Sequence, residues 1–116
     1  MPDDEARPAR DSDVVGAVET PAMRRVRRRI DAVDRRIVRL LNDRTRLGIE
    51  AGAAKAAAGL AIRDPERERE VLLRVAAANE GPLPQADLLA LYRRLMAATR
   101  RLEATARRRE RATRRR

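Results

Sequence analysis

Five polar or charged side chains interrupt the apolar stripes of three expected helices, and their types could do chemistry. They are Arg44, Lys55, Glu68, Thr99 and Glu103. Removing an unpaired charge from water costs several kcal/mol, so each charged member needs a partner or a ligand. Cations on a long helix and hydrogen-bonding groups on two others together predict a polar pocket for a small, highly anionic molecule.

The same side chains could instead pair with one another as structural bridges in a small helical core. Arg44–Glu68 and Lys55–Glu103 would be the pairs. One observation favours a functional role, because Lys55 is the single lysine among 28 basic residues. A lysine kept where every other cation is arginine indicates a position that needs a compact ammonium group rather than a planar guanidinium.

The composition limits the chemistry available to the chain. Cys and His are both absent, which excludes disulfides, thiol nucleophiles, imidazole bases and metal sites built on sulfur or nitrogen ligands. Catalysis would depend on Arg, Lys, carboxylates and hydroxyls, and we expect no metal and no cofactor. A length of 116 residues allows one small domain, whose core, with one Tyr and no Phe or Trp, would be thin for a monomer.

The apolar spacing predicts one long helix from Met23 to about Lys55. Its apolar residues recur every three or four positions, a period close to 3.5. Such a helix would be about 50 Å long, too long for the rest of a 116-residue chain to cover its stripe. We therefore expect a homodimer in which a second copy covers it.

Two further helices complete the expected fold. Asp64-Pro65 predicts the start of the second, because a carboxylate caps a helix well and Pro fits the first helical position. Gly81 is its expected terminator, and the third helix is expected to fray after about Ala106. No strand pattern is present, so we expect an all-α fold: a three-helix protomer with one long helix, in an intertwined dimer.

We divide the sequence into three parts. Residues 1–22 are acidic, carry three prolines and show no periodicity, and we expect a disordered acidic N-terminal arm. Residues 23–106 form the helical domain, and residues 107–116 an Arg-rich C-terminal tail.

The first residues lack the profile of a signal peptide, and no apolar run reaches the ~18 residues of a membrane span. We therefore expect a cytoplasmic protein that does not bind membranes.

Two segments carry a family resemblance. RRRIDAVDRRIVRLLNDR lies in the long helix, and Lys55 is followed nine residues later by the element DPERE, which begins at Asp64. Over about residues 24–103 the sequence closely resembles the all-helical chorismate mutases of the AroQ type. The resemblance implies an intertwined dimer with two equivalent sites, each completed by one arginine of the other chain. It also implies rearrangement of chorismate to prephenate without metal, cofactor or covalent intermediate.

The resemblance implies roles for three cations. Arg27 matches the arginine that reaches into the partner's site and holds one substrate carboxylate. Arg44 matches the arginine that binds the other carboxylate within the same chain. Lys55 matches the lysine that contacts the ether oxygen and a carboxylate.

It also implies roles for four other residues. Asp64 and Glu68 match the pair that holds the ring hydroxyl, and Thr99 stands where the family often has a Ser that contacts a carboxylate. Glu103 departs from the common pattern, because bacterial relatives usually have a Gln that donates an N–H to the ether oxygen. A carboxylate cannot donate, so Glu103 would have to be protonated to do the same. Arg44, Lys55 and Glu103 are the expected catalytic residues.

Other interpretations stay open. The 4-amino-4-deoxychorismate mutases perform the same rearrangement on an amine substrate, and the carboxylates Asp64 and Glu68 would suit its ammonium group. Isochorismate-pyruvate lyases share the fold, although the intact DPERE element is more typical of mutases. A basic, dimeric nucleic-acid-binding module is a distant alternative that the lack of aromatic stacking residues disfavours. The Arg-rich tail could also dock onto another shikimate-pathway enzyme.

Overall fold

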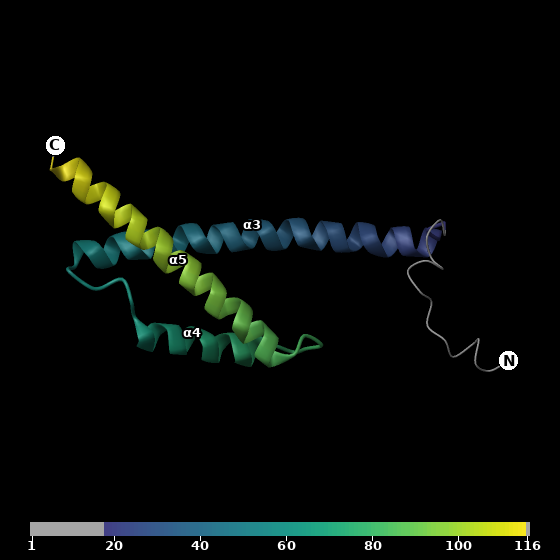
Figure 1. Cartoon of the computed structure of the whole chain (residues 1–116). Helices are drawn as coiled ribbons and strands as arrows, with labels where there is room; N and C mark the ends of the chain where they lie inside the picture. Colours follow the sequence, from purple (N-terminus) through teal and green to yellow (C-terminus); the bar gives the residue numbers. More distant parts are fainter. Residues whose placement is uncertain (1–17, 116) are drawn as a thin grey trace, which may run out of the picture. The chain divides into compact units, whose positions relative to one another are not determined.

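The computed structural model of the chain describes residues 18–115, which form three α-helices and no strand. Helix α3 spans Pro21–Ala57, helix α4 spans Pro65–Ala78 and helix α5 spans Gln85–Arg114 (Figure 1). The predicted all-α fold with one long helix is confirmed. Most of the expected acidic arm, residues 1–17, lies outside the described residues.

Helix α3 begins two residues earlier than the apolar periodicity predicts. The Thr20 hydroxyl caps it by accepting a hydrogen bond of 3.1 Å from the Met23 backbone N–H, and Pro21 takes the first helical position. The chain divides into two compact units inside this helix, between Val38 and Arg39. The cavity described below is lined only by residues of the second unit.

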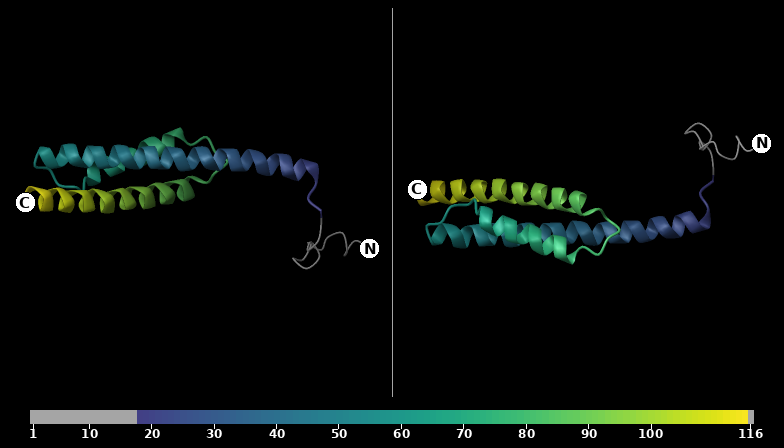
Figure 2. Two further views of the ribbon diagram at one scale, coloured as in Figure 1. Left: turned by 90° about the horizontal axis from the view of Figure 1, so that it is seen from above. Right: turned by 90° about the horizontal axis from the view of Figure 1, so that it is seen from below.

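In the second unit α4 runs back from the end of α3, and α5 then runs in the same direction as residues 39–57 of α3 (Figure 1). Two glycines let α3 and α5 approach closely, and both views of Figure 2 show these helices side by side. Gly48 faces Thr99, and a Cβ on Gly52 would lie 2.7 Å from Cγ of Glu103. The close approach places two α5 residues directly against the α3 backbone.

The start of α4 follows the sequence signals. Asp64 accepts a hydrogen bond of 3.1 Å from the backbone N–H of Arg67, and Pro65 opens the helix. Beyond its last residue, Gly81 has φ +76°, a conformation that side chains with a Cβ rarely adopt. The predicted cap of α4 is therefore confirmed. The helix ends at Ala78 with Asn79 as an extended C-cap, so Gly81 shapes the turn that follows and does not terminate the helix.

Helix α5 does not fray after Ala106, and this expectation was wrong. The helix continues to Arg114, because Arg and Ala are strong helix formers and Arg114 forms a 2.8 Å ion pair with Glu110 one turn earlier. Arg107 also anchors this C-terminal part of α5 by donating a hydrogen bond of 2.9 Å to the carbonyl of Leu60.

A single chain buries little apolar surface. Among the described residues, Met96 is the only large apolar side chain that is buried, and it is still 6% exposed. The apolar seam of α3 is about half exposed or more along its length, at Val26, Ile30, Val33, Ile37, Leu40 and Leu47. No helix among residues 18–115 combines the length and apolar character needed to cross a membrane.

Candidate active site

A cavity of about 290 Å³ lies in the second unit and is lined by residues of all three helices. Its charged and hydroxyl lining residues are Arg44, Lys55, Asp64, Arg67, Glu68, Thr99, Arg100 and Glu103. Six of the seven predicted site residues are in this set. The structure therefore brings together side chains that lie up to 59 positions apart, Arg44 and Glu103.

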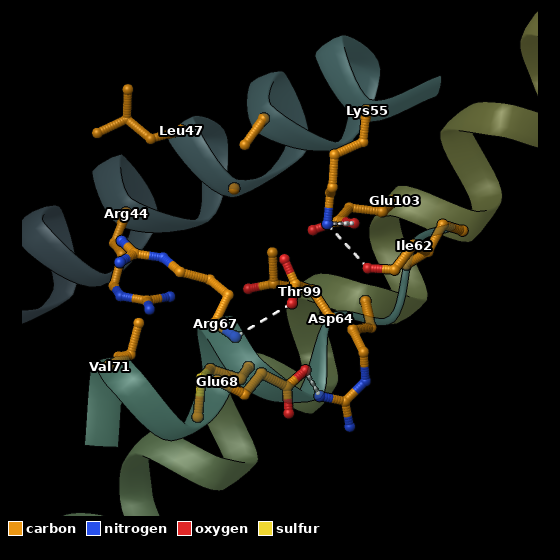
Figure 3. Close-up of a pocket in the computed structure, with 14 residues that line it drawn as sticks. Arg44, Leu47, Lys55, Ile62, Asp64, Arg67, Glu68, Val71, Thr99 and Glu103 are labelled. Atoms are coloured by element: carbon orange, nitrogen blue, oxygen red, sulfur yellow. Dashed lines mark hydrogen bonds and ion pairs between the residues drawn. The ribbon is translucent and has the colours of Figure 1, made fainter. Parts of the chain in front are cut away.

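Lys55 and Glu103 form one end of the cavity (Figure 3). The Lys55 ammonium donates to the carbonyl of Ile62 at 2.8 Å and lies 3.5 Å from Oε2 of Glu103. Glu103 is almost completely buried, and its Oε2 has no hydrogen-bond partner. The predicted Lys55–Glu103 pairing is therefore present, but as a long contact that leaves a buried oxygen without a hydrogen bond.

Arg44 lies in the same cavity, apart from the Lys55–Glu103 pair in Figure 3. Its guanidinium carbon is 5.5 Å from the centre of the Tyr92 ring, within the range of a cation–π interaction. The suggested bridge from Arg44 to Glu68 is not what the structure contains, because Glu68 forms its ion pair with Arg100. Arg44 thus stacks against the face of the Tyr92 ring, and its guanidinium N–H groups can bind a ligand.

The first turn of α4 contributes two carboxylates to the cavity wall. Asp64 is engaged as the helix cap, and Glu68 pairs with Arg100 of α5. Thr99 is buried between α3 and α5, and its hydroxyl donates to the Leu95 carbonyl at 2.9 Å. Its oxygen can still accept a hydrogen bond from a ligand.

Arg27 is the one predicted site residue that does not line the cavity. It belongs to the first unit, is largely exposed, and forms a 2.5 Å ion pair with Glu19. A role in the partner's site stays a prediction.

Comparison with known proteins decides the family. Residues 26–104 match the family described as chorismate mutase type II. The chain belongs to this family. A chorismate mutase from Thermus thermophilus, in the structure called Form II, has 36% sequence identity and a TM-score of 0.69, with 72% of this chain and 94% of that chain covered. Form I of the same protein gives 36% identity and a TM-score of 0.65, over 67% of this chain and 98% of that one.

Curated relatives of this chorismate mutase family member are longer proteins. A bifunctional chorismate mutase/prephenate dehydratase from Aquifex aeolicus is 38% identical over 79 residues, which cover 65% of this chain and 22% of the relative. The protein of the same name from Neisseria gonorrhoeae is 39% identical over 71 residues, covering 61% and 19%. The chain thus spans about a fifth of the length of these relatives.

Sequence reasoning about this chorismate mutase type II domain gave no role to Arg100, Gly48 or Gly52. Arg100 could not be found from sequence, because its partner Glu68 lies 32 residues earlier, on another helix. The glycines did leave a signal: two glycines four residues apart, in a helix otherwise made of good helix formers, indicate a close helix contact. Within residues 18–115, no group of three or more Asp, Glu, His or Cys side chains is placed to hold a metal ion.

Proposed function

We propose that this chain is a chorismate mutase, which converts chorismate to prephenate by a concerted [3,3] rearrangement within one molecule. The observation that carries the proposal is the cavity that Arg44, Lys55 and buried Glu103 all line, in a member of the chorismate mutase type II family. The rearrangement needs neither a nucleophile nor a base. A site made of cations, carboxylates and a hydroxyl is sufficient for it, with no metal or cofactor.

The first catalytic contribution is selection of the reactive conformer. A planar guanidinium binds a carboxylate through two parallel hydrogen bonds, and Arg44 stands in the cavity with its orientation supported by Tyr92. In our proposal Arg44 holds one carboxylate of chorismate and the partner's Arg27 holds the other. Fixing both carboxylates restrains the compact diaxial conformer, in which the two carbons that form the new bond are close together.

The second contribution is stabilisation of the ether oxygen, which gains negative charge as its bond to carbon breaks. The Lys55 ammonium has three N–H donors; one binds Ile62, and another faces Glu103. A further donor remains for the ether oxygen of a bound substrate. Glu103, when protonated, donates a second hydrogen bond to the same oxygen. Preorganised donors of this kind are most effective in a cavity that excludes water.

We further propose a homodimer, in the cytoplasm, as the active form. Its support is the apolar seam of α3, which a single chain leaves exposed from Val26 to Leu47. The 3.5-residue spacing of this seam suits helix-against-helix packing, and association of two copies would cover apolar surface of both. The partner's Arg27 would then reach each cavity.

The proposal is tested by incubating the purified protein with chorismate and following prephenate formation. We expect turnover by the wild type and near-complete loss in Arg44→Ala, with Arg46→Ala as a matched control, because Arg46 is an exposed residue of the same helix. Absence of turnover by the wild-type chain would contradict the proposal. Salt-dependent DNA binding that survives Arg44→Ala, without mutase activity, would favour the nucleic-acid alternative instead.

A further inference from the structure

The carboxylates of the candidate active site are all engaged by partners in this chain. Asp64 accepts the backbone N–H of Arg67, and Glu103 faces the Lys55 ammonium. The third, Glu68, is in direct ion-pair contact with Arg100. Of the three carboxylates in the cavity, Glu68 and Glu103 thus each face a cation of this chain, whereas Asp64 is held by a backbone N–H.

The balance of charge in the cavity favours a ligand that is purely anionic. Four cationic side chains line it against three carboxylates. Arg44 has an aromatic ring rather than a carboxylate as its partner, and the side chain of Arg67 pairs with Glu70, which is not a lining residue. Arg44 and Arg67 are thus not paired with a carboxylate of the cavity and can bind an anionic ligand. Arg100 supplies another of the four positive charges.

The Arg100–Glu68 ion pair determines the charge of the cavity wall beside α4, because Arg100 neutralises the carboxylate of Glu68. Both side chains are about three-quarters buried, at 26% and 23% exposed, so solvent screens the pair less than it screens a surface ion pair. Without Arg100, Glu68 would become a partly buried carboxylate that has lost its ion-pair partner. Such a group gains most from a ligand that brings a positive charge.

We propose that Arg100 is a specificity-determining residue that acts through Glu68: by neutralising this carboxylate it makes the site accept a substrate with a neutral hydroxyl and reject the analogue with a protonated amine. The inference rests on the proposed function and deepens it, because it selects chorismate over 4-amino-4-deoxychorismate. In the presence of Arg100, Glu68 can still accept a hydrogen bond from a hydroxyl through its second oxygen. An ammonium group would have to compete with the guanidinium and would be repelled by it.

The test measures kcat/KM for both compounds in the wild type and in Arg100→Leu, which removes the charge and keeps an apolar stem. We expect the ratio of the two values to move toward the amine by about tenfold or more, the size of effect expected when one partner of a buried charge pair is lost. Arg100→Lys should restore most of the preference for the hydroxyl. Arg101→Leu is the matched control on the same helix, because Arg101 is exposed and lies outside the cavity, and its ratio should stay at the wild-type value.

A second substitution separates the electrostatic role from a structural one. In the double variant Arg100→Leu with Glu68→Gln the gain for the amine should disappear, because no carboxylate remains to attract it. If Arg100→Leu does not fold, Arg100→Gln removes the charge while keeping a hydrogen-bonding group, and the same shift is expected.

The outcomes also separate the inference from the proposed function. Equal losses on both compounds in Arg100→Leu, with an unchanged ratio, would mean that Arg100 binds a carboxylate shared by both and would overturn the inference. A wild-type chain that turns over neither compound would contradict the proposed function. In that case calorimetry gives the dissociation constants of both compounds for the wild type and for Arg100→Leu. A ratio of the two constants that moves toward the amine in Arg100→Leu supports the inference, and an unchanged ratio overturns it.

Discussion

Lys55 is the residue whose surroundings are best explained by a bound ligand. Its side chain is three-quarters buried, yet its ammonium is fixed by one backbone carbonyl at 2.8 Å and a carboxylate oxygen at the longer distance of 3.5 Å. A lysine serving only as a structural bridge would be expected to make a shorter, hydrogen-bonded contact with Glu103. The loose geometry leaves Oε2 of Glu103 and a further N–H of Lys55 available to a third group beside them.

Replacing Lys55 with Ala should therefore remove catalysis without unfolding the chain. Losing one donor to a developing oxyanion costs about 10²–10³ in rate, and we expect kcat on chorismate to fall by at least this factor. Far-ultraviolet circular dichroism should still report a helical protein. Arg46→Ala is the control, because Arg46 is exposed on the same helix. A Lys55→Ala variant with kcat near the wild-type value would remove the proposed mechanism.

Glu103 should act as a hydrogen-bond donor to the ether oxygen, from its place beside Lys55. Only a protonated carboxyl can donate such a bond, whereas the amide of Gln always carries N–H donors. Glu103→Gln should therefore retain kcat on chorismate, measured as prephenate formation. A Glu103→Gln variant without turnover would contradict the donor role.

At the level of the helices, the site depends on how closely α3 and α5 approach each other. Gly48 and Gly52 lie one turn apart on α3, directly against Thr99 and Glu103 on α5. The glycines have a cost, because each lowers helix propensity by about 1 kcal/mol relative to Ala. Their presence is explained by the side chains of α5 that occupy the space of the missing Cβ atoms.

Gly52→Ala should consequently destabilise the protein although it improves the helix propensity of α3. The added Cβ would lie 2.7 Å from Cγ of buried Glu103, and overpacking of this kind costs about 1–3 kcal/mol. We expect a lower midpoint of chemical denaturation and a lower kcat, since Glu103 must move. Glu50→Ala, at an exposed position of the same helix, should leave both quantities unchanged. A stabilised, fully active Gly52→Ala variant would show that the helices do not need this close contact.

Arg107 connects the extension of α5 to the loop that precedes α4. It donates to the carbonyl of Leu60 at 2.9 Å and more weakly to that of Gly52 at 3.5 Å. Arg107→Ala should lower the free energy of unfolding by about 1–2 kcal/mol and speed amide hydrogen exchange in residues 58–63. Arg109→Ala, at an exposed position of the same extension, should do neither. Unchanged exchange in Arg107→Ala would contradict the anchoring role.

For the molecule as a whole, the sequence predicted more of the helices than of the contacts between them. Asp64 and Pro65 mark the start of α4 by local chemistry that acts within a few residues, and these predictions are confirmed. The pairing of Glu68 with Arg100 rather than Arg44 depends on the relative rotation of two helices, which no local signal specifies. The continuation of α5 was missed because the run of arginines was interpreted as an unstructured tail, although arginine favours helix.

Mixed dimers of two variants test most sharply whether Arg27 of one copy serves the site of the other. If each cavity uses Arg44 of its own chain and the partner's Arg27, a heterodimer of Arg27→Ala and Arg44→Ala chains contains one intact site and one that lacks both arginines. Refolding the two inactive variants together in equal amounts makes half the dimers mixed, so about a quarter of all sites, and about a quarter of wild-type activity, should return.

Each variant refolded alone is the control and should stay inactive. If Arg27 served its own chain's site, every chain in the mixture would lack one arginine and no activity would return. Light scattering on the same samples should report two chains per particle, and a monomer with full activity would contradict the dimer. The activity regained by the mixture, together with the particle mass, thus tests two points. One is whether two copies associate through the exposed seam of α3, and the other is whether that association completes the site.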